Sequence, residues 1–447
     1  MIEFPPAFVQ RMEKSLQNEW SSFIDAFSKE ATTSIRINTK KKKITLPNPV
    51  PWADSGYYLD KRPSFTLDPT FHAGAYYVQE ASSMLLEQAI KQFVNLDEPI
   101  RALDLCAAPG GKSTHIVSLL NDDSLLISNE VIRSRASVLS ENIQKWGYGN
   151  VIVTNNDPSD FEKLTGYFDL IVVDAPCSGE GLFRKDPNSI QQWSEENVLL
   201  CSQRQQRIVA DIWLSLKENG ILIYSTCTYN EAENENNLEW LANNNQVEFI
   251  SLKLNSNWGI EEVKKGKAIG YRCLPHKVKG EGFFISVIRK KEAAQSVSIK
   301  SKNSFQLASK KIKDSLIDWQ LPHDYDLVML DDLIVSLPGQ YITEIDFLSR
   351  SLKTVLKGTA IAIQKHDKFI PEHSLALSIH LNTSHFKTIE LTLEEAILYL
   401  KKETLMIGEG ERGFALVTYQ NIPLGWVNLL GNRVNNLYPS GWRILMR

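Results

Sequence analysis

Two cysteines stand at the ends of apolar runs that are typical of buried β-strands. Residues 168–175 (FDLIVVDA) are followed within two positions by Cys177, and residues 220–227 (GILIYSTC) end on Cys227. A lone cysteine at a strand end more often only packs. Two at the ends of adjacent strands, beside Asp174, instead indicate nucleophilic chemistry, because a thiolate attacks electrophilic carbon and forms covalent intermediates.

The other three cysteines are predicted to play lesser parts. Cys201 lies in a helical apolar pattern and is expected in the core, Cys106 lies in a glycine-containing loop where close packing suffices, and Cys273 has no assigned role. The total of five is odd and sparse, and no C-x-x-C pair occurs. Neither a disulfide framework nor a structural zinc site is therefore expected, and no metal is predicted.

A loop with two glycines follows the first predicted strand, over residues 104–113 (DLCAAPGGKS). Glycines at this place let a ligand approach the backbone near a helix N-terminus. A phosphate-binding Walker loop needs a glycine where Cys106 stands, and Pro109 lies inside the loop, so phosphate binding is disfavoured.

Two acids close the next two predicted strands. Glu130 ends residues 123–130, about 20 positions after the glycines, where an acid binds ribose hydroxyls in nucleotide-binding folds. Asp157 ends residues 150–157 and is placed to meet an adenine edge. The strict G-x-G-x-x-G pattern is absent, so a cofactor with a single nucleoside is favoured over a dinucleotide.

Alternating strands and helices predict how these residues are brought together. Helical patterns separate five apolar runs, and two later runs (247–252 and 282–290) are expected to finish the sheet; the five are residues 100–105, 123–130, 150–157, 168–175 and 220–227. Such alternation predicts an α/β fold with a doubly wound parallel sheet. Ligands bind outside the carboxyl ends of such strands, so both cysteines and both acids should share one edge.

Composition sets the class of protein. The 447 residues are 43% hydrophobic and 23% charged with a net charge of -4, which is ordinary globular composition. No apolar run approaches the roughly 18 residues of a membrane helix, and the N-terminus lacks a signal-peptide layout, so a cytoplasmic protein is expected. Composition and patterning predict four parts, an N-terminal segment, an α/β domain, a linker and a C-terminal region, over residues 1–70, 71–291, 292–304 and 305–447.

Four segments of the chain resemble, in order, motifs of the Nop/Sun family of RNA cytosine-C5 methyltransferases. They are LDLCAAPGGKS, VVDAPCSGEGLFRKDP, YSTCTY and GYRCLPHKVKGEGFF, and the resemblance covers about residues 70–290. Within this family, the chain resembles the bacterial ribosomal RNA small-subunit methyltransferase F subfamily. This narrower resemblance rests on the element Arg36-Ile37-Asn38, the chain length and the C-terminal tail. This implies a Rossmann-like class I S-adenosylmethionine-dependent methyltransferase domain with an N-terminal α/β RNA-binding segment and a C-terminal PUA-like extension.

The resemblance also implies a chemistry and a cofactor. Cys227 would attack cytosine C6, Cys177 would assist product release, and Asp174 would contact the ring near N3. S-adenosylmethionine would be held by Cys106, Ala107, Ala108, Pro109, Gly110, Gly111, Lys112, Glu130, Asp157 and Asp174. Lys112 is also a positive neighbour that can activate a thiol, with a phosphate or solvent contact as the alternative.

The expected partner is ribosomal RNA or the small ribosomal subunit, with 16S ribosomal RNA as substrate. The same reaction on transfer RNA, a P-loop nucleotide hydrolase and a non-catalytic RNA-binding assembly factor remain alternatives. No obvious pairing helix occurs, so a monomer is expected. Basic and aromatic side chains are predicted to contact RNA; they are Arg36, Lys40 to Lys43, Arg184, Lys185, Arg433, Arg443, Tyr438 and Trp442.

Overall fold

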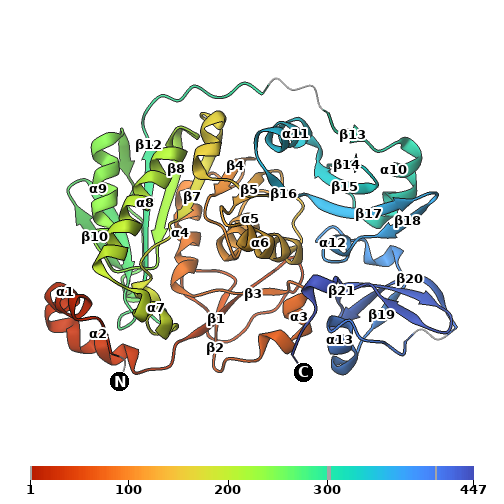
Figure 1. The fold of residues 1–447 in the computed structure, drawn as a ribbon, viewed down its shortest axis with the longest axis horizontal. Helices are drawn as coiled ribbons and strands as arrows, with labels where there is room; N and C mark the ends of the chain where they lie inside the picture. The colour runs from red at the N-terminus through yellow and green to blue at the C-terminus, as the bar shows by residue number, and fades with distance from the viewer. Residues whose placement is uncertain (1–2, 300–303, 408–409, 447) are drawn as a thin grey trace.

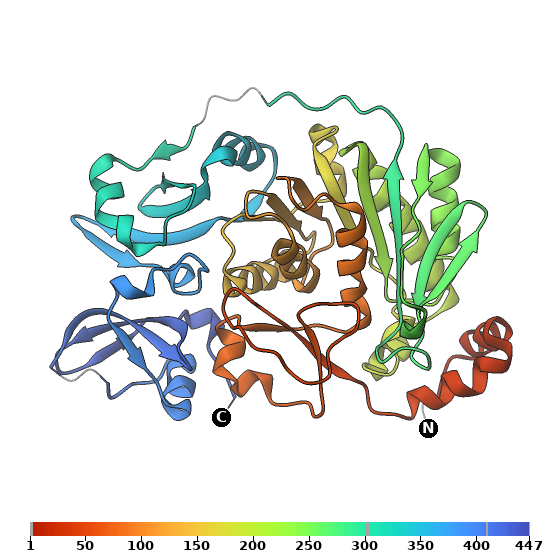
Figure 2. The same cartoon turned by 180° about the vertical axis from the view of Figure 1, so that it is seen from behind.

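The computed structural model describes residues 3–299, 304–407 and 410–446, and it is built around a ten-stranded mixed sheet (Figures 1 and 2). The order along the sheet is β10-β11-β12-β8-β7-β4-β5-β6-β16. Its parallel centre consists of β4 (Arg101–Asp104), β5 (Leu125–Asn129), β6 (Val151–Thr154), β7 (Phe168–Asp174) and β8 (Leu216–Thr226). These are the five strands that the apolar runs predict, and the α/β class is confirmed.

Helices cover both faces of this sheet, as a doubly wound fold requires. On one face Ile90, Ile116 and Leu139 join a core with strand residues such as Leu126; these side chains belong to α4 (Leu86–Phe93), α5 (Gly111–Leu119) and α6 (Arg133–Trp146). The opposite core takes Ile208, Leu238 and Ile345 from α8 (Glu195–Trp213), α9 (Glu235–Asn244) and α11 (Ile342–Ser351). The strand order reverses between β4 and β7, which is where such folds bind ligands.

Antiparallel strands complete both edges of the sheet. The predicted later runs form β9 (Val247–Phe249) and β12 (Phe283–Lys290), and β12 pairs with β8, which confirms that they finish the sheet. The hairpin of β10 (Glu261–Lys265) and β11 (Ala268–Cys273) extends this edge without having been anticipated. At the other edge β16 (Thr354–Lys357), from the C-terminal region, pairs with β6.

The N-terminal residues form two helices and a small sheet. The helices α1 (Pro6–Leu16) and α2 (Trp20–Phe27) pack through Phe8 and Phe23 against the segment that contains Phe183, Trp193 and α7 (Pro187–Gln192). The small sheet, in the order β2-β1-β3, comprises β1 (Thr33–Ile37), β2 (Gly56–Leu59) and β3 (Tyr76–Val78), with α3 (Pro69–His72) before β3.

The C-terminal region contains two further sheets. The five-stranded one, with α10 (Lys310–Leu316) and α12 (His373–Ala376), comprises β13 (Gln306–Leu307), β14 (Tyr325–Leu330), β15 (Leu333–Pro338), β17 (Thr359–Lys365) and β18 (Lys368–Pro371). The four-stranded one, with α13 (Leu393–Leu400), comprises β19 (Thr388–Glu390), β20 (Arg412–Tyr419), β21 (Ile422–Leu430) and β22 (Val434–Asn436). Residues 292–299 before them contain neither helix nor strand.

Shared cores join these parts. Ile35 and Tyr76 of the small N-terminal sheet lie in one core with Val417 and Val427 of the four-stranded sheet, so the two ends of the chain pack together. Another core joins Ile361 of the five-stranded sheet to Trp426. Within the described ranges, no helix combines the length and hydropathy needed to cross a bilayer.

Candidate active site

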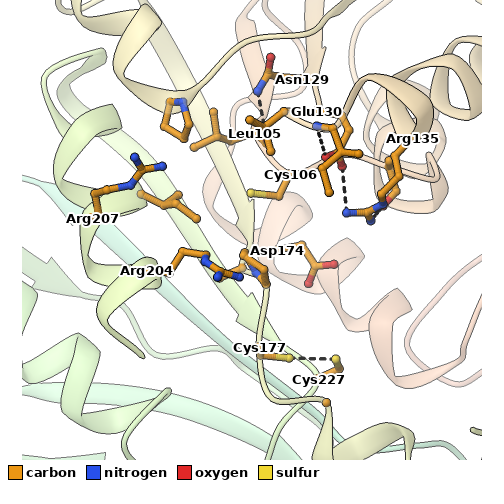
Figure 3. Close-up of a pocket in the computed structure, with 18 of the residues that line it drawn as sticks. Leu105, Cys106, Asn129, Glu130, Arg135, Asp174, Cys177, Arg204, Arg207 and Cys227 are labelled. Carbon is orange, nitrogen blue, oxygen red and sulfur yellow. Dashed lines mark hydrogen bonds and ion pairs between the residues drawn. The ribbon is translucent and has the colours of Figure 1, made fainter. Parts of the chain in front are cut away.

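The thiols of Cys177 and Cys227 meet at the carboxyl ends of β7 and β8. These strands are parallel neighbours with Asp174 opposite Ser225, so the residues that follow them emerge side by side. The Sγ atoms are 3.0 Å apart (Figure 3). Both thiols line a cavity of about 470 Å³ that also contains Cys106, Glu130 and Asp174. The hydrogen bond with Cys227, together with burial, raises the pKa of Cys177 well above its ordinary range, so Cys177 holds its proton at neutral pH.

An ion pair lies beside the thiols. Lys112 Nζ is 2.7 Å from Asp174 Oδ2, and Asp174 Oδ1 accepts a hydrogen bond of 2.8 Å from Ser225 Oγ. Burial acts to lower the pKa of Lys112, but Asp174, with Asp104 and Cys227, raises it above its ordinary value. Lys112 is therefore a positive charge at neutral pH, and it lies close enough to Cys227 to interact with it electrostatically.

The loop between β4 and α5 forms one wall of the site around the thiols and the ion pair. Gly110 has a left-handed φ of +117°, and a Cβ atom at Gly111 would stand 3.3 Å from the Tyr77 ring, so both positions suit glycine. Helix α6 holds the loop because Arg135 donates to the Ala108 carbonyl at 2.8 Å. A second cavity of about 150 Å³ adjoins the first through Cys106, Ala108 and Asp174; it is also lined by Ala107, Pro109, Gly111, Lys112 and residues around β3.

The two predicted strand-end acids take different positions. Glu130 is 2% exposed and lines the large cavity, where it accepts from the Ile132 amide at 2.9 Å and lies 3.3 Å from Arg135. Asp157 does not line that cavity. It lies 3.0 Å from Arg207, and hydrogen bonds from Ser159 and Arg207 outweigh partial burial and lower its pKa. Of these two chain segments, the one after β5 thus gives the cavity the carboxylate of Glu130, whereas the one after β6 gives it only Pro158.

Several residues of the site were missed by the sequence analysis. Asp104, at the end of β4, is fully buried with Oδ2 2.6 Å from Ser113 Oγ, and burial raises its pKa to about 7. Arg204 and Arg207 line the large cavity from α8, and Arg204 makes no hydrogen bond or ion pair within the described residues (Figure 3). The signal for the arginines was their spacing of three on one helix, which puts both on one face.

Three predicted RNA contacts are wrong because the side chains are already engaged. Arg36 is fully buried, bonds Gln79 and Thr114 at 2.9 and 2.6 Å, and stacks on Trp146, so it joins the small N-terminal sheet to α5 and α6. Arg184 is 6% exposed and pairs with Glu281 at 2.9 Å. Tyr438 is 1% exposed and belongs to the core.

The lysine run is partly engaged as well. Lys41 donates to the carbonyls of Ala73 and Lys145 at 2.8 and 2.6 Å, and burial lowers its pKa to about 7. Lys40 pairs with Asp122 at 3.2 Å on the surface. Only Lys42 and Lys43 of this run have no such partner among the described residues, so the run offers less positive charge to RNA than its sequence indicates.

Three family models match the chain. The model described as 16S rRNA methyltransferase RsmB/F matches residues 91–289, the N-terminal domain of 16S rRNA methyltransferase RsmF matches residues 4–81, and the methyltransferase RsmF PUA domain matches residues 386–444. Together these matches cover the small N-terminal sheet, the central sheet without β16 and the four-stranded sheet.

Curated relatives match over nearly the whole chain. The ribosomal RNA small subunit methyltransferase F of Shewanella loihica is 31% identical, with 98% of this chain and 95% of the relative covered. That of Shewanella woodyi is 32% identical, with 98% and 96% covered.

Solved structures share the fold of the catalytic part. A methyltransferase homologue from Pyrococcus horikoshii is 29% identical with a TM-score of 0.52, and the match covers 61% of this chain and 90% of that one. The NSun6 structure from the same organism, described as solved with SFG, has a TM-score of 0.52 at 19% identity and covers 65% and 99% of the two chains.

Proposed function

The chain belongs to the RsmF family of 16S rRNA methyltransferases, and from this we propose that it methylates carbon C5 of cytosine in 16S rRNA through a covalent Cys227 adduct. Its methyl donor is S-adenosylmethionine. The observation that carries the proposal is the 3.0 Å approach of Cys177 and Cys227 in the cavity that Glu130 and Asp174 also line.

The residues of the two cavities fit this cofactor. We assign the ribose hydroxyls to Glu130, whose carboxylate faces the large cavity, and the base to the apolar side chains of Leu105, Ile132 and Ile208. The amino-acid end would lie against the loop of residues 106–112. When bound, S-adenosylmethionine supplies an electrophilic methyl group. The carboxylates of Glu130 and Asp174 would repel nucleotide phosphates, which argues against a P-loop hydrolase.

Catalysis by a cysteine overcomes the low reactivity of cytosine C5 toward a methyl donor. C5 of cytosine is a weak nucleophile, so the Cys227 thiolate first forms a bond to C6 and the electrons of the C5–C6 double bond become available at C5. Lys112, which is ion-paired with Asp174, would stabilise the negative charge that the ring acquires on addition. After C5 has been methylated, a base takes the C5 proton, the C5–C6 double bond re-forms, and the C6–S bond breaks with its electrons returning to the Cys227 thiolate.

Cys177 suits a role in this last step. Its raised pKa keeps the proton on sulfur, and its Sγ lies within hydrogen-bond distance of Cys227. A protonated Cys177 therefore donates to Cys227 and stabilises the thiolate that leaves C6. This supports the assignment of Cys227 as nucleophile and Cys177 as the residue that assists release.

The test is methyl transfer from labelled S-adenosylmethionine to 16S rRNA, followed by bisulfite sequencing of the product. The proposal expects label in 16S rRNA and a protected cytidine at the methylated position. Transfer RNA from the same strain is the competing substrate. Label in transfer RNA alone would overturn the 16S assignment, and label at a position other than cytosine C5 would overturn the chemistry.

A further inference from the structure

Cys177 and Cys227 form the one thiol–thiol contact in the described part of the chain, which contains all five cysteines. Their Sγ atoms are 3.0 Å apart and face one another (Figure 3). A disulfide bond is about 2.05 Å long, so an approach of about 1 Å would join the two sulfurs. The proposed methylation uses both sulfurs in the reduced state and gives no role to an oxidised pair.

The segments that carry the two thiols are held together by contacts of their own. Ser178 and Thr228, which directly follow the two cysteines, approach to 3.2 Å between their hydroxyl oxygens. The Gly181 amide donates to the Cys227 carbonyl at 2.8 Å, and a Cβ atom at Gly181 would lie 2.8 Å from the same oxygen, so the two segments are closely packed. The sulfurs are therefore brought together by contacts that do not depend on the thiols themselves.

The pair is accessible to small molecules, whereas two of the other cysteines are not. Cys177 and Cys227 are half-buried, and both line the cavity of about 470 Å³. Cys201 and Cys273 are only 5% and 0% exposed. A small oxidant that enters the cavity therefore meets the paired thiols but does not meet Cys201 or Cys273.

Cys106 is the third thiol of this cavity and the competing partner. It is half-buried and lines the same cavity, but no hydrogen bond joins its sulfur to another thiol within the described ranges. Burial, with Asp104 and Asp174 acting in the same direction, raises the pKa of the Cys106 thiol, so it keeps its proton and is a weak nucleophile. Both position and protonation favour the pairing of Cys177 with Cys227.

We propose that Cys177 and Cys227 are a modification site at which hydrogen peroxide forms a reversible disulfide. In the first step the Cys227 thiolate attacks one peroxide oxygen, the O–O bond breaks, hydroxide leaves, and Cys227 becomes a sulfenic acid. In the second step the Cys177 sulfur bonds to the Cys227 sulfur, the S–O bond breaks, and the hydroxide leaves as water with the Cys177 proton. Two sulfurs are oxidised, and both peroxide oxygens are reduced to the level of water.

The first step prepares the second. The hydrogen bond with Cys227 and the charge of its thiolate are two of the causes that raise the pKa of Cys177. Both end when Cys227 becomes a neutral sulfenic acid, so Cys177 then gives up its proton more readily. The assignment of Cys227 as the first thiol to react rests on the proposed function, but the same disulfide forms if Cys177 reacts first.

The disulfide has two consequences. It stops methyl transfer, because the Cys227 sulfur cannot bond to cytosine C6 while it is bonded to Cys177. It also protects the nucleophile, because a sulfenic acid without a partner thiol is oxidised further to a sulfinic acid, which dithiothreitol does not reduce. Transient disulfides of this kind are the ones expected where thiols are otherwise kept reduced.

The test treats the purified full-length chain, without RNA, with hydrogen peroxide, and then alkylates the remaining thiols under denaturing conditions. We expect the wild type to lose two alkylatable thiols and the mass of two hydrogen atoms, and digestion to yield a Cys177–Cys227 peptide. Dithiothreitol should restore both thiols and, in a separate assay, methyl transfer. The matched control is Cys201→Ser, at a buried site outside the cavity, which should form the same disulfide.

A second variant separates a resolved thiol from an unresolved one. In Cys177→Ser, Cys227 has no partner, so peroxide should add two oxygen atoms to it and dithiothreitol should not reverse the change. S-adenosylmethionine should bind this variant as it binds the wild type, which reports that the variant is folded. Recovery of Cys177→Ser by dithiothreitol as complete as that of the wild type would overturn the proposal.

The remaining outcomes keep this inference apart from the proposed function. A disulfide that joins Cys106 to either thiol, or five intact thiols in the wild type at a peroxide dose that oxidises Cys177→Ser, would overturn the modification site even if the reduced protein methylates RNA. Methyl transfer that continues in the disulfide form would overturn its inhibitory effect. A Cys177–Cys227 disulfide in a protein that transfers no methyl group when reduced would instead count against the proposed function.

Discussion

Lys112 and Asp174 form an ion pair, 2.7 Å between Nζ and Oδ2, at the boundary between the two cavities of the candidate active site. Asp174 lines both cavities, whereas Lys112 lines the smaller one. The pair thus joins the loop that we assign to the cofactor, which includes Lys112, to the end of β7 near the two thiols.

Removing the positive charge should slow the chemical step. We expect Lys112→Met to lower kcat about 10²-fold, because charge on the cytosine ring loses its stabilising partner, with a smaller change in the KM for RNA. The matched control is Lys217→Met, which removes the partner of Asp169 at 2.5 Å near the other end of β7. Equal effects of the two substitutions on kcat would contradict the role of Lys112.

The two thiols should respond differently to substitution. Cys227→Ala should abolish methyl transfer while S-adenosylmethionine still binds, since the nucleophile is lost and the cofactor contacts remain. Cys177→Ala should trap a covalent protein–RNA adduct, visible as a species of reduced mobility on a denaturing gel. Cys201→Ala, at a buried site on α8, is the control and should turn over normally. Normal turnover by both Cys177→Ala and Cys227→Ala would refute the assignment.

Glu130 and Asp157 should contribute unequally to cofactor affinity. Glu130→Ala should raise the Kd of S-adenosylmethionine at least about tenfold, because hydrogen bonds to a charged group are worth about 1.5–3 kcal/mol. Asp157→Ala should raise it only about threefold or less, since this side chain pairs with Arg207 and does not itself line the cavity. Calorimetric titration of each variant measures the difference, and a larger loss with Asp157→Ala would show that the pocket closes around the cofactor differently.

Helix α1 should stabilise the loop that follows Cys177. Arg11 lies 2.6 Å from Glu180, which is fully buried and also accepts from Trp193 and Asn230. Arg11→Met should lower the free energy of unfolding by about 2–4 kcal/mol, because it leaves a buried carboxylate without its cation. Arg11→Met/Glu180→Gln should recover part of this loss in urea unfolding. A double variant less stable than the single one would contradict this explanation.

Acid should destabilise the protein in part through His373. Burial, with Lys145, Lys41 and Lys402 nearby, lowers the pKa of His373 to about 3, below the ordinary value of about 6.5. Between about pH 6.5 and pH 3 the unfolded chain therefore binds a proton at His373 that the folded chain does not bind. The stability that neutral His373 contributes is fully present above pH 6.5 and is lost as the pH falls toward 3.

Replacing this histidine should flatten the pH dependence. His373→Phe should reduce the slope of unfolding free energy against pH by about 1.4 kcal/mol per unit between about pH 6 and 4. Urea unfolding at several pH values measures the slope, and His385→Phe, at an exposed position, is the control. An unchanged slope for His373→Phe would mean that another group takes up the proton.

Local patterns predicted the parallel centre of the sheet but not its edges. The runs that became β4 to β8 are apolar because both faces are covered, which is visible in any single segment. Strand β10 (EEVKK) is polar and half-exposed, and β16 joins the sheet only through β6, more than 190 residues earlier in the chain. Pairing between such distant segments leaves no periodic signal in either one.

The site shows the same division between local and distant information. Positions at strand ends follow from the topology, so Cys177, Cys227 and Glu130 could be placed at one edge before their contacts were seen. Arg36 and Arg184 were misjudged because a cation in sequence is normally exposed, whereas Gln79 and Glu281, which hold them, come from other segments. Asp157 was expected to end a strand, but β6 ends at Thr154, and Asp157 caps the following 3₁₀ helix, pairs with Arg207 of α8 and does not line the cavity.

The core that Ile35 and Tyr76 share with Val417 and Val427 has a consequence for biosynthesis. A ribosome releases the chain from the N-terminus onward, so the first β-sheet to be made is without its packing surface until nearly the entire protein has emerged. Completion of synthesis and completion of the fold are thereby coupled, and a nascent chain that stops short leaves those early apolar residues open to solvent and to chaperones.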